Sequence, residues 1–354
     1  MIYREVGELH ASYVDDSRVF PIQQDRIFIW ALLAVAFVGV PLVGTDYWYS
    51  AIFIPFLILS LAALGLNILT GYAGQLSLGT AAFMAVGAFA AFNFAVRLPK
   101  IPVLVDFVLA GLVAAGVGLV FGLPSLRIKG FYLAVATLAA QFFIEWLLTK
   151  VSWFSNDNPS GVINAPRIVI LGLAFDRPAR RYLLTLAIVV LLAAAAKNMV
   201  RSQVGRAWMA VRDMDIAAEV VGIPMLKTKL LAFGVSSFYC GVAGALWAFL
   251  YLGSVEPQAF DLSRSFQILF MIIVGGMGSV LGSFLGAAFI VLLPIFLNVA
   301  AQKFLPHAGS SLASNLEIIV FGGLILFFLA VEPHGLARLW QTGKEKLRLW
   351  PFPH

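Results

Sequence analysis

Charged residues are scarce in this sequence. They make up 12% of its 354 residues, about half the fraction of an ordinary soluble domain, whereas 61% of the residues are hydrophobic. This composition excludes a water-soluble globule. Several apolar runs reach the roughly 17 to 25 residues that a helix needs to cross a hydrocarbon core, and the alternating pattern of a membrane barrel is missing. We therefore predict an all-α, polytopic membrane protein.

Cysteine and histidine are almost absent. The single cysteine, Cys240, lies in an apolar run, which excludes a disulfide within the chain and argues against a thiolate metal site. The four histidines, at positions 10, 307, 334 and 354, fall near termini or loops. Because no apolar segment carries clustered His, Cys or paired carboxylates, an intramembrane enzyme is disfavoured, and we expect no metal site and no catalytic residue.

A phosphate-binding loop is also missing. The chain contains no Gly-x-x-x-x-Gly-Lys-Ser/Thr, and Gly343 and Lys344 lack the rest of that motif. If the protein performs active transport, we expect no cofactor on this chain and ATP hydrolysis in a partner subunit. The formal charge of +6 comes from Lys and Arg spread through loops, which fits the positive-inside rule and excludes nucleic acid as a partner.

Apolar runs and loop charges define the expected topology. Residues 1–25 carry five acids and no early apolar run, which indicates a polar N-terminal cytoplasmic extension rather than a signal peptide. Residues 26–333 form the membrane domain, and 334–354 form a basic amphipathic cytoplasmic tail. About ten crossings are expected, some short or broken by glycine, with both termini in the cytoplasm: 26–44, 50–69, 79–97, 103–124, 131–150, 182–199, 225–252, 266–276, 279–301 and 314–331.

Two uncharged regions are interrupted by glycine. Residues 27–96 contain no Lys or Arg, yet "GYAGQLSLG" (71–79) breaks them, and "VGGMGSVLGSFLG" (274–286) breaks residues 265–302. The latter region is too short for two standard crossings and a turn, so one crossing should be short. Paired Gly-interrupted segments point to a transport pathway of discontinuous helices. Close helix packing through small residues explains them equally well.

Polar groups and freed backbone near these breaks are the candidate pathway lining, because they can hydrogen-bond a passing solute. Three polar residues of the predicted helix 131–150 can also line the pathway: Tyr132, Thr137 and Gln141. They can equally well form hydrogen bonds between helices. Glu145 lies on the same face but close enough to Lys150 to reach the interface. The candidates at the breaks are Asn67, Gly71, Tyr72, Gly74, Gln75, Ser77, Gly79, Gly275, Gly276 and Gly278.

The segment 201–229 is too polar to cross the membrane and predicts a short amphipathic helix at about 203–224. Gly222 and Pro224 end it. Such a helix can lie on lipid, pack on its own protein or dock into a partner; its acidic residues favour docking. At helical spacing, one apolar stripe is formed by Trp208, Val211, Met214, Ala218 and Val221.

Several motifs carry a family resemblance. They are "LGLNILTGYAGQLSLGTAAFMAVGAF" (64–89), "GLPSLRIKGFYLAVATLA" (122–139) and "VGGMGSVLGSFLGA" (274–287). In this order they resemble the permease subunits of branched-chain amino-acid ABC importers. The segment 201–229 resembles their coupling loop, which implies that ATPase coupling involves Gly205, Arg206, Arg212, Asp213, Ala217, Ala218, Glu219, Gly222 and Ile223.

The resemblance implies partners and a location. It implies two ABC ATPase subunits, a second homologous permease, an extracytoplasmic solute-binding protein and the bacterial inner membrane. The segment 155–181 is the longest outer loop, so it is either the docking surface for that binding protein or an ordinary covering loop. The implied solutes are Leu, Ile and Val, with urea, aromatic or short organic acids as alternatives. An ion-coupled secondary transporter is a further alternative, although such proteins usually carry titratable groups at mid-membrane, which are few here.

Overall fold

The computed structural model describes residues 23–99, 101–126, 128, 130–155, 162–166, 168–170, 173–304, 319–320, 322–323, 326–328, 330 and 335–349. Within them, eight helices are long and apolar enough to cross a membrane. The prediction of an all-helical, polytopic membrane protein is thereby confirmed. These spans are Asp25–Val43, Trp48–Tyr72, Thr80–Arg97, Val103–Gly122, Phe131–Lys150, Pro178–Arg201, Met225–Leu252 and Val280–Val299.

The two remaining predicted crossings are special cases. The first is α13 (Leu262–Gly275), which has only 14 residues; its shortness agrees with the residue count, and it is not among the eight spans. It turns sharply into α14 (Val280–Phe304). The second, at 314–331, lies largely outside the described residues.

Three helices form the centre of the bundle. They are α4 (Ile54–Asn67), α5 (Thr80–Arg97) and α12 (Met225–Leu246), and most of each is buried. A Cβ on Gly244 of α12 would overlap the carbonyl oxygen of Met84 in α5, and one on Gly87 would overlap the backbone of Gly241. Glycine at these positions lets the helix backbones approach closely, as small residues do in membrane bundles.

Short π-helical segments, labelled η, extend two of the central helices. Alpha-helix α4 is preceded by η2 (Trp48–Phe53) and followed by η3 (Ile68–Tyr72), and α12 continues into η5 (Trp247–Leu252). Around them pack α6 (Val103–Gly122), α7 (Phe131–Lys150) and α9 (Pro178–Arg201). The first span consists of α2 (Gln23–Ala34), η1 (Val35–Gly39) and α3 (Val40–Val43), and none of it is buried.

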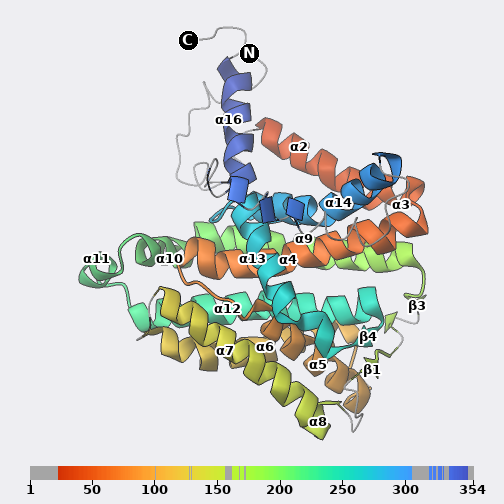
Figure 1. The fold of residues 1–354 in the computed structure, drawn as a ribbon, viewed down its shortest axis with the longest axis horizontal. Helices are drawn as coiled ribbons and strands as arrows, with labels where there is room; N and C mark the ends of the chain where they lie inside the picture. Colours follow the sequence, from red (N-terminus) through yellow and green to blue (C-terminus); the bar gives the residue numbers. More distant parts are fainter. Residues whose placement is uncertain are drawn as a thin grey trace.

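The connecting segments gather at two opposite ends of the bundle. In Figure 1, α10 (Gln203–Asp213) and α11 (Asp215–Val220) lie at the left edge. The right edge carries β1 (Ile163–Asn164), β3 (Leu173–Ala174) and β4 (Ser254–Val255). Strand β1 pairs antiparallel with β4, and β2 (Val169–Ile170) with β3. The segments predicted to face opposite sides of the membrane therefore do lie at opposite ends.

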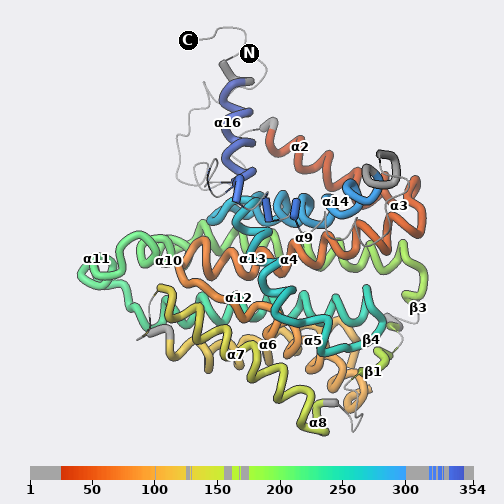
Figure 2. The backbone as a smooth tube through the Cα atoms, viewed as in Figure 1, coloured from red at the N-terminus to blue at the C-terminus, as the bar shows by residue number. Residues whose placement is uncertain are grey.

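Both ends of the described chain lie together. Helix α16 (Gly335–Leu349) stands beside α2 at the top of Figure 2. Lys344 Nζ lies 2.7 Å from Asp25 Oδ1, and the rings of Phe28 and Trp340 are in contact. At the start of α16, Gly335 packs against the backbone of Gly276.

Candidate functional site

Helix α10 is firmly attached to the membrane domain. The hydroxyl of Ser202 accepts the N–H of Val204 and caps the helix. The side chain of Trp208 is fully buried, and its Nε1 donates to the carbonyl oxygen of Thr228 at 3.1 Å. A Cβ on Gly205 would overlap the Val200 carbonyl, so glycine is needed for the tight turn from α9. These contacts make α10 and the start of α12 one packed unit.

The predicted single helix at 203–224 is divided. Met214 adopts an extended conformation (φ −158°, ψ 94°), which separates α10 from α11 and rotates the faces of the two helices relative to each other. The predicted apolar stripe is right for Trp208, Val211 and Ala218, which are buried. It is wrong for Met214 and Val221, which are 69% and 82% exposed.

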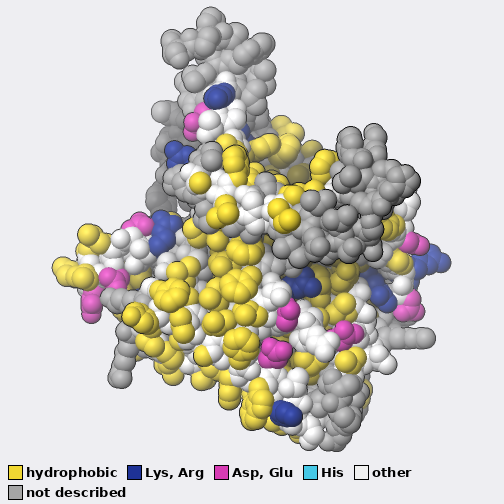
Figure 3. Space-filling view, viewed as in Figure 1, with side chains coloured by type: hydrophobic (Ala, Val, Ile, Leu, Met, Phe, Trp, Pro, Cys, Tyr) yellow, Lys and Arg dark blue, Asp and Glu magenta, His cyan; other side chains and the backbone are white. Residues whose placement is uncertain are grey.

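An apolar surface results from this division. Four large hydrophobic side chains at α11 are exposed, and Figure 3 shows hydrophobic and acidic side chains together at this left edge. The predicted residue Ala218 faces inward, whereas Ala217 and Glu219 are exposed, and Gly222 ends the segment with φ +95°. We call this surface the α11 patch; it consists of Met214, Ile216, Val220 and Val221.

Arg212 joins α10 to the first glycine-rich break. Its Nη1 donates to the carbonyl oxygen of Gly71 at 2.9 Å, and its Nε donates to Asp213 Oδ1 at 2.9 Å. Gly74 has φ +69°, and a Cβ there would lie 2.8 Å from Arg212 Cγ. A Cβ on Gly278, in the second break, would lie 3.2 Å from Arg212 Nη1. The end of α4, the α13–α14 turn and the predicted coupling helix therefore meet at one arginine.

Asn67 ties the two breaks to each other. Its Oδ1 accepts the N–H of Gly278 at 2.8 Å, and its Nδ2 donates to the carbonyl of Ser279 and the hydroxyl of Ser283. A Cβ on Gly71 would overlap both Asn67 Oδ1 and the Gly278 nitrogen. Since α4 and the α13–α14 turn are locked in this way, we treat Arg212, Asn67 and the glycines around them as one junction.

Other predicted residues have packing roles at these breaks. Gly276 and Gly278 have φ of +114° and +77°, which glycine adopts without strain. A Cβ on Gly275 would overlap the Gly282 carbonyl, so this glycine lets α13 and α14 pack closely. Tyr72 and Ser77 are buried, and Gly79 would place a Cβ 2.7 Å from the Thr137 carbonyl oxygen.

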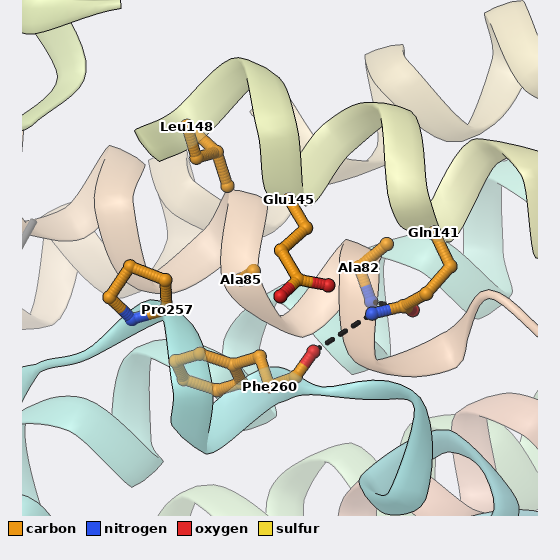
Figure 4. Close-up of a pocket in the computed structure, with 7 residues that line it drawn as sticks. All are labelled: Ala82, Ala85, Gln141, Glu145, Leu148, Pro257 and Phe260. Carbon is orange, nitrogen blue, oxygen red and sulfur yellow. Dashed lines mark hydrogen bonds between the residues drawn. The ribbon is translucent and has the colours of Figure 1, made fainter. Parts of the chain in front are cut away.

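Polar side chains cap the start of α5. Thr137 Oγ1 accepts the N–H of Leu78 at 2.9 Å. Gln141 Oε1 accepts the N–H of Ala82, and its Nε2 donates to the carbonyl of Phe260 at 2.8 Å, as Figure 4 shows. These bonds satisfy the free amides at a helix N-terminus inside the protein. Contact of Thr137 and Gln141 with solute stays a prediction.

The structure does not bring every candidate into this cluster. Tyr132 is 76% exposed on the bundle surface, away from Thr137 and Gln141. Glu145 points into a narrow space beside Ala85 and Phe260 (Figure 4), which is too small to hold a water molecule.

Two serines in uncharged regions were missed by sequence reasoning. Ser265 Oγ accepts the N–H of Ala81 and donates to Gln141, and Ser283 bonds Asn67. For Ser283, the available signal was a short polar residue among apolar ones next to a break, whereas Ser265, which directly follows Arg264, offered no such signal.

The fold and the junction define a multi-pass membrane protein whose amphipathic segment is hydrogen-bonded to the first helix break and lies against the second. The family model described as the permease component of the branched-chain amino acid transport system matches residues 48–329, which include the whole junction. The chain belongs to this family. It is an ABC permease subunit rather than an enzyme, and permeases of this kind work with ATPase subunits.

Curated relatives agree with this assignment. The chain is 31% identical over 304 residues to the high-affinity branched-chain amino acid transport system permease protein LivM of Escherichia coli K12, covering 77% of this chain and 66% of that protein. It is 30% identical to LivM of Salmonella typhimurium, covering 88% and 75%. It is 28% identical to the probable ABC transporter permease protein y4mJ of Sinorhizobium fredii, covering 60% and 64%. No solved structure matches the chain.

Proposed function

We propose that this chain is the membrane-spanning permease of an importer for Leu, Ile and Val, driven by ATP hydrolysis in two attached ATPase subunits. A second homologous permease completes the membrane pathway, and an extracytoplasmic binding protein delivers the solute. The observation that carries the proposal is the bond between Arg212 and the Gly71 carbonyl, because it connects an exposed amphipathic segment to the first helix break, which Asn67 ties to the second.

The proposed mechanism starts at the α11 patch. Apolar side chains exposed beside charged residues are typical of a surface that docks a partner. When ATP binding closes the ATPases, the docked α11 moves with them. Helix α10 follows because it is joined to α11 at Met214, and its buried Trp208 moves the start of α12 with it. Arg212 and Asn67 pass the displacement to the ends of α4 and α13. Rearrangement of these elements then alternates access to the pathway.

The proposed orientation places α10, α11 and both termini in the cytoplasm of a bacterial inner membrane. The contact between Lys344 and Asp25 supports a common side for the two ends of the described chain. The segment 162–181, of which parts are described, then lies outside, where β1 and β4 anchor a surface for the binding protein.

Uptake by the assembled importer in proteoliposomes tests the proposed function. We expect labelled Leu, Ile and Val to accumulate only when the binding protein and ATP are both supplied. Uptake of urea, an aromatic or a short organic acid with none of the three amino acids would contradict the solute assignment. Uptake driven by an ion gradient without ATPase subunits would contradict the importer class.

Reversing one charge tests the docking surface. Glu219 is exposed on α11, next to Val220 of the patch. Glu219→Arg should leave the membrane helices folded but reduce co-purification of the ATPase subunits. The reason is that it replaces a negative charge by a positive one in the proposed contact between α11 and the ATPase, where the new charge is either repelled or unpaired. Asp46→Arg is the control, since Asp46 is equally exposed but lies between the first two spans. Undiminished co-purification with Glu219→Arg would count against this docking surface.

A further inference from the structure

Helix α16 runs across the direction of the membrane spans. Figure 2 shows it projecting from the bundle beside α2, crosswise to α4 and α9. Its start has a fixed position, because Gly335 packs against the backbone of Gly276 in the α13–α14 turn. The helix carries four basic residues and one acid, and it is not one of the eight spans. A basic amphipathic helix in this position lies along the surface of a membrane.

A cluster of charged groups joins α16 to the ends of two spans. Asp25 is the first residue of the span Asp25–Val43, and Arg201 is the last residue of the span Pro178–Arg201. Lys344 Nζ of α16 lies 2.7 Å from Asp25 Oδ1. Lys197, one turn before the end of α9, interacts electrostatically with all three of these residues. This group of four, which we call the basic cluster, therefore lies at the membrane boundary, where lipid headgroups are found.

The charge of the basic cluster is positive. It contains three cationic side chains and one carboxylate, which leaves a net charge of +2 among these four described residues. Arg206 adds a further guanidinium next to the cluster, since its Nη1 donates to the carbonyl oxygen of Arg201 at 3.4 Å. The side chains of Lys344 and Asp25 are only 33% and 25% exposed. Because partly buried charges are screened less by salt than exposed ones, the cluster favours an anionic ligand.

An apolar surface continues from the basic cluster into the membrane. After Asp25 and Arg26, α2 exposes Ile27, Phe28 and Trp30. The ring of Trp340 in α16 contacts that of Phe28, and Trp340 is itself partly exposed, as expected for tryptophan at the level of the headgroups. A ligand with an anionic head and long apolar chains matches both parts of this surface. A soluble phosphate or an acidic protein segment matches only the charge.

We propose that the basic cluster binds the headgroup phosphate of an anionic phospholipid, whose acyl chains lie along the exposed face of α2. Lys197 and Arg201 contact the phosphate from α9, and Lys344 contacts it from α16. Asp25 holds the ammonium group of Lys344 in place. This inference goes beyond the proposed function and holds whichever solute is transported.

Native mass spectrometry of the full-length chain tests the site. The chain in a neutral detergent is titrated with phosphatidylglycerol and, separately, with phosphatidylcholine of the same acyl chains. The lipid-bound fraction gives an apparent dissociation constant. Each net charge near a membrane surface changes the affinity about 5-fold, so we expect phosphatidylglycerol to bind about 25-fold more tightly than phosphatidylcholine. Glycerol 3-phosphate, the soluble analogue of the headgroup, should not displace the lipid.

Charge variants should change this preference in opposite directions. Lys197→Gln combined with Lys344→Gln should weaken phosphatidylglycerol binding about 25-fold and leave phosphatidylcholine binding unchanged. Asp25→Asn should strengthen phosphatidylglycerol binding about 5-fold, which is a gain that misfolding cannot produce. The control is Lys150→Gln combined with Lys227→Gln, which removes the same charge from exposed positions in two other spans and should leave the preference in place.

Each other outcome is decisive. Equal affinity for the two lipids, or equal weakening by the two double variants, overturns the site. Displacement of phosphatidylglycerol by glycerol 3-phosphate shows a site for a soluble phosphate and overturns the lipid assignment. Unchanged or weaker phosphatidylglycerol binding by Asp25→Asn contradicts the role of charge. None of these measurements depends on uptake, so a failure of this site leaves the proposed function untouched.

Discussion

Arg212→Met is expected to abolish uptake while the ATPase subunits remain attached. The variant keeps an unbranched apolar stem but removes the donor to the Gly71 carbonyl, so α10 can move without the end of α4. A hydrogen bond from a charged group contributes about 1.5–3 kcal/mol, which corresponds to roughly a 10- to 150-fold loss of coupling. ATP hydrolysis by the assembled complex should continue but no longer depend on the loaded binding protein.

The control for this variant is Arg97→Met. Arg97 also donates from its guanidinium to a backbone carbonyl, that of Trp153 at 2.8 Å, but at the other end of the bundle. It should reduce stability slightly and leave ATP hydrolysis coupled to uptake. Arg212→Lys should restore only part of the uptake, because an ammonium group lacks the planar fork of arginine. Coupled uptake by Arg212→Met at the wild-type rate would refute the role of this bond.

Gly74→Leu should reduce uptake far more than expression. Two costs add at this position. The φ of +69° strains any residue with a Cβ by about 1–2 kcal/mol, and the new Cβ would lie 2.8 Å from Arg212 Cγ and 3.1 Å from its Cα. Because the second contact includes backbone of α10, the junction must open for leucine to fit.

Gly253→Leu separates these two costs. Gly253 has a closely similar φ of +74°, but a Cβ there would have no neighbour within 4 Å. It lies next to β4, away from the junction. Thermal unfolding should show a loss of stability from backbone strain alone in Gly253→Leu and a larger loss in Gly74→Leu, whereas uptake should be lost only with Gly74→Leu. Normal uptake by Gly74→Leu would remove this glycine from the coupling mechanism.

Much of the fold follows from patterns that the sequence displays directly. Long apolar runs place the helices, since a membrane span requires them, and the count of residues in 265–302 predicts that α13 is short. The division at Met214 was not predictable by periodicity. Neither glycine nor proline stands there, and the extended backbone is stabilised by packing of α10 and α11 on α12, which is a tertiary effect.

The junction was predictable only in its parts. Glycine runs and the family resemblance select Gly71, Gly74, Arg212 and Gly278 as separate groups, for a pathway and for coupling. Their contact joins residues 141 positions apart, Arg212 and Gly71, and no local pattern encodes that distance. The same holds for Gln141, whose bonds reach α5 and the segment before α13.

The contact between Asp25 and Lys344 bears on how the protein is made. The two residues are 319 positions apart, so the ribosome delivers Asp25 long before Lys344. An ion pair of this exposure adds at most about 1 kcal/mol, yet it can form only after the intervening spans have been inserted. The exposed first span therefore gains its contact with α16 only late in folding, after the helices between them have entered the membrane.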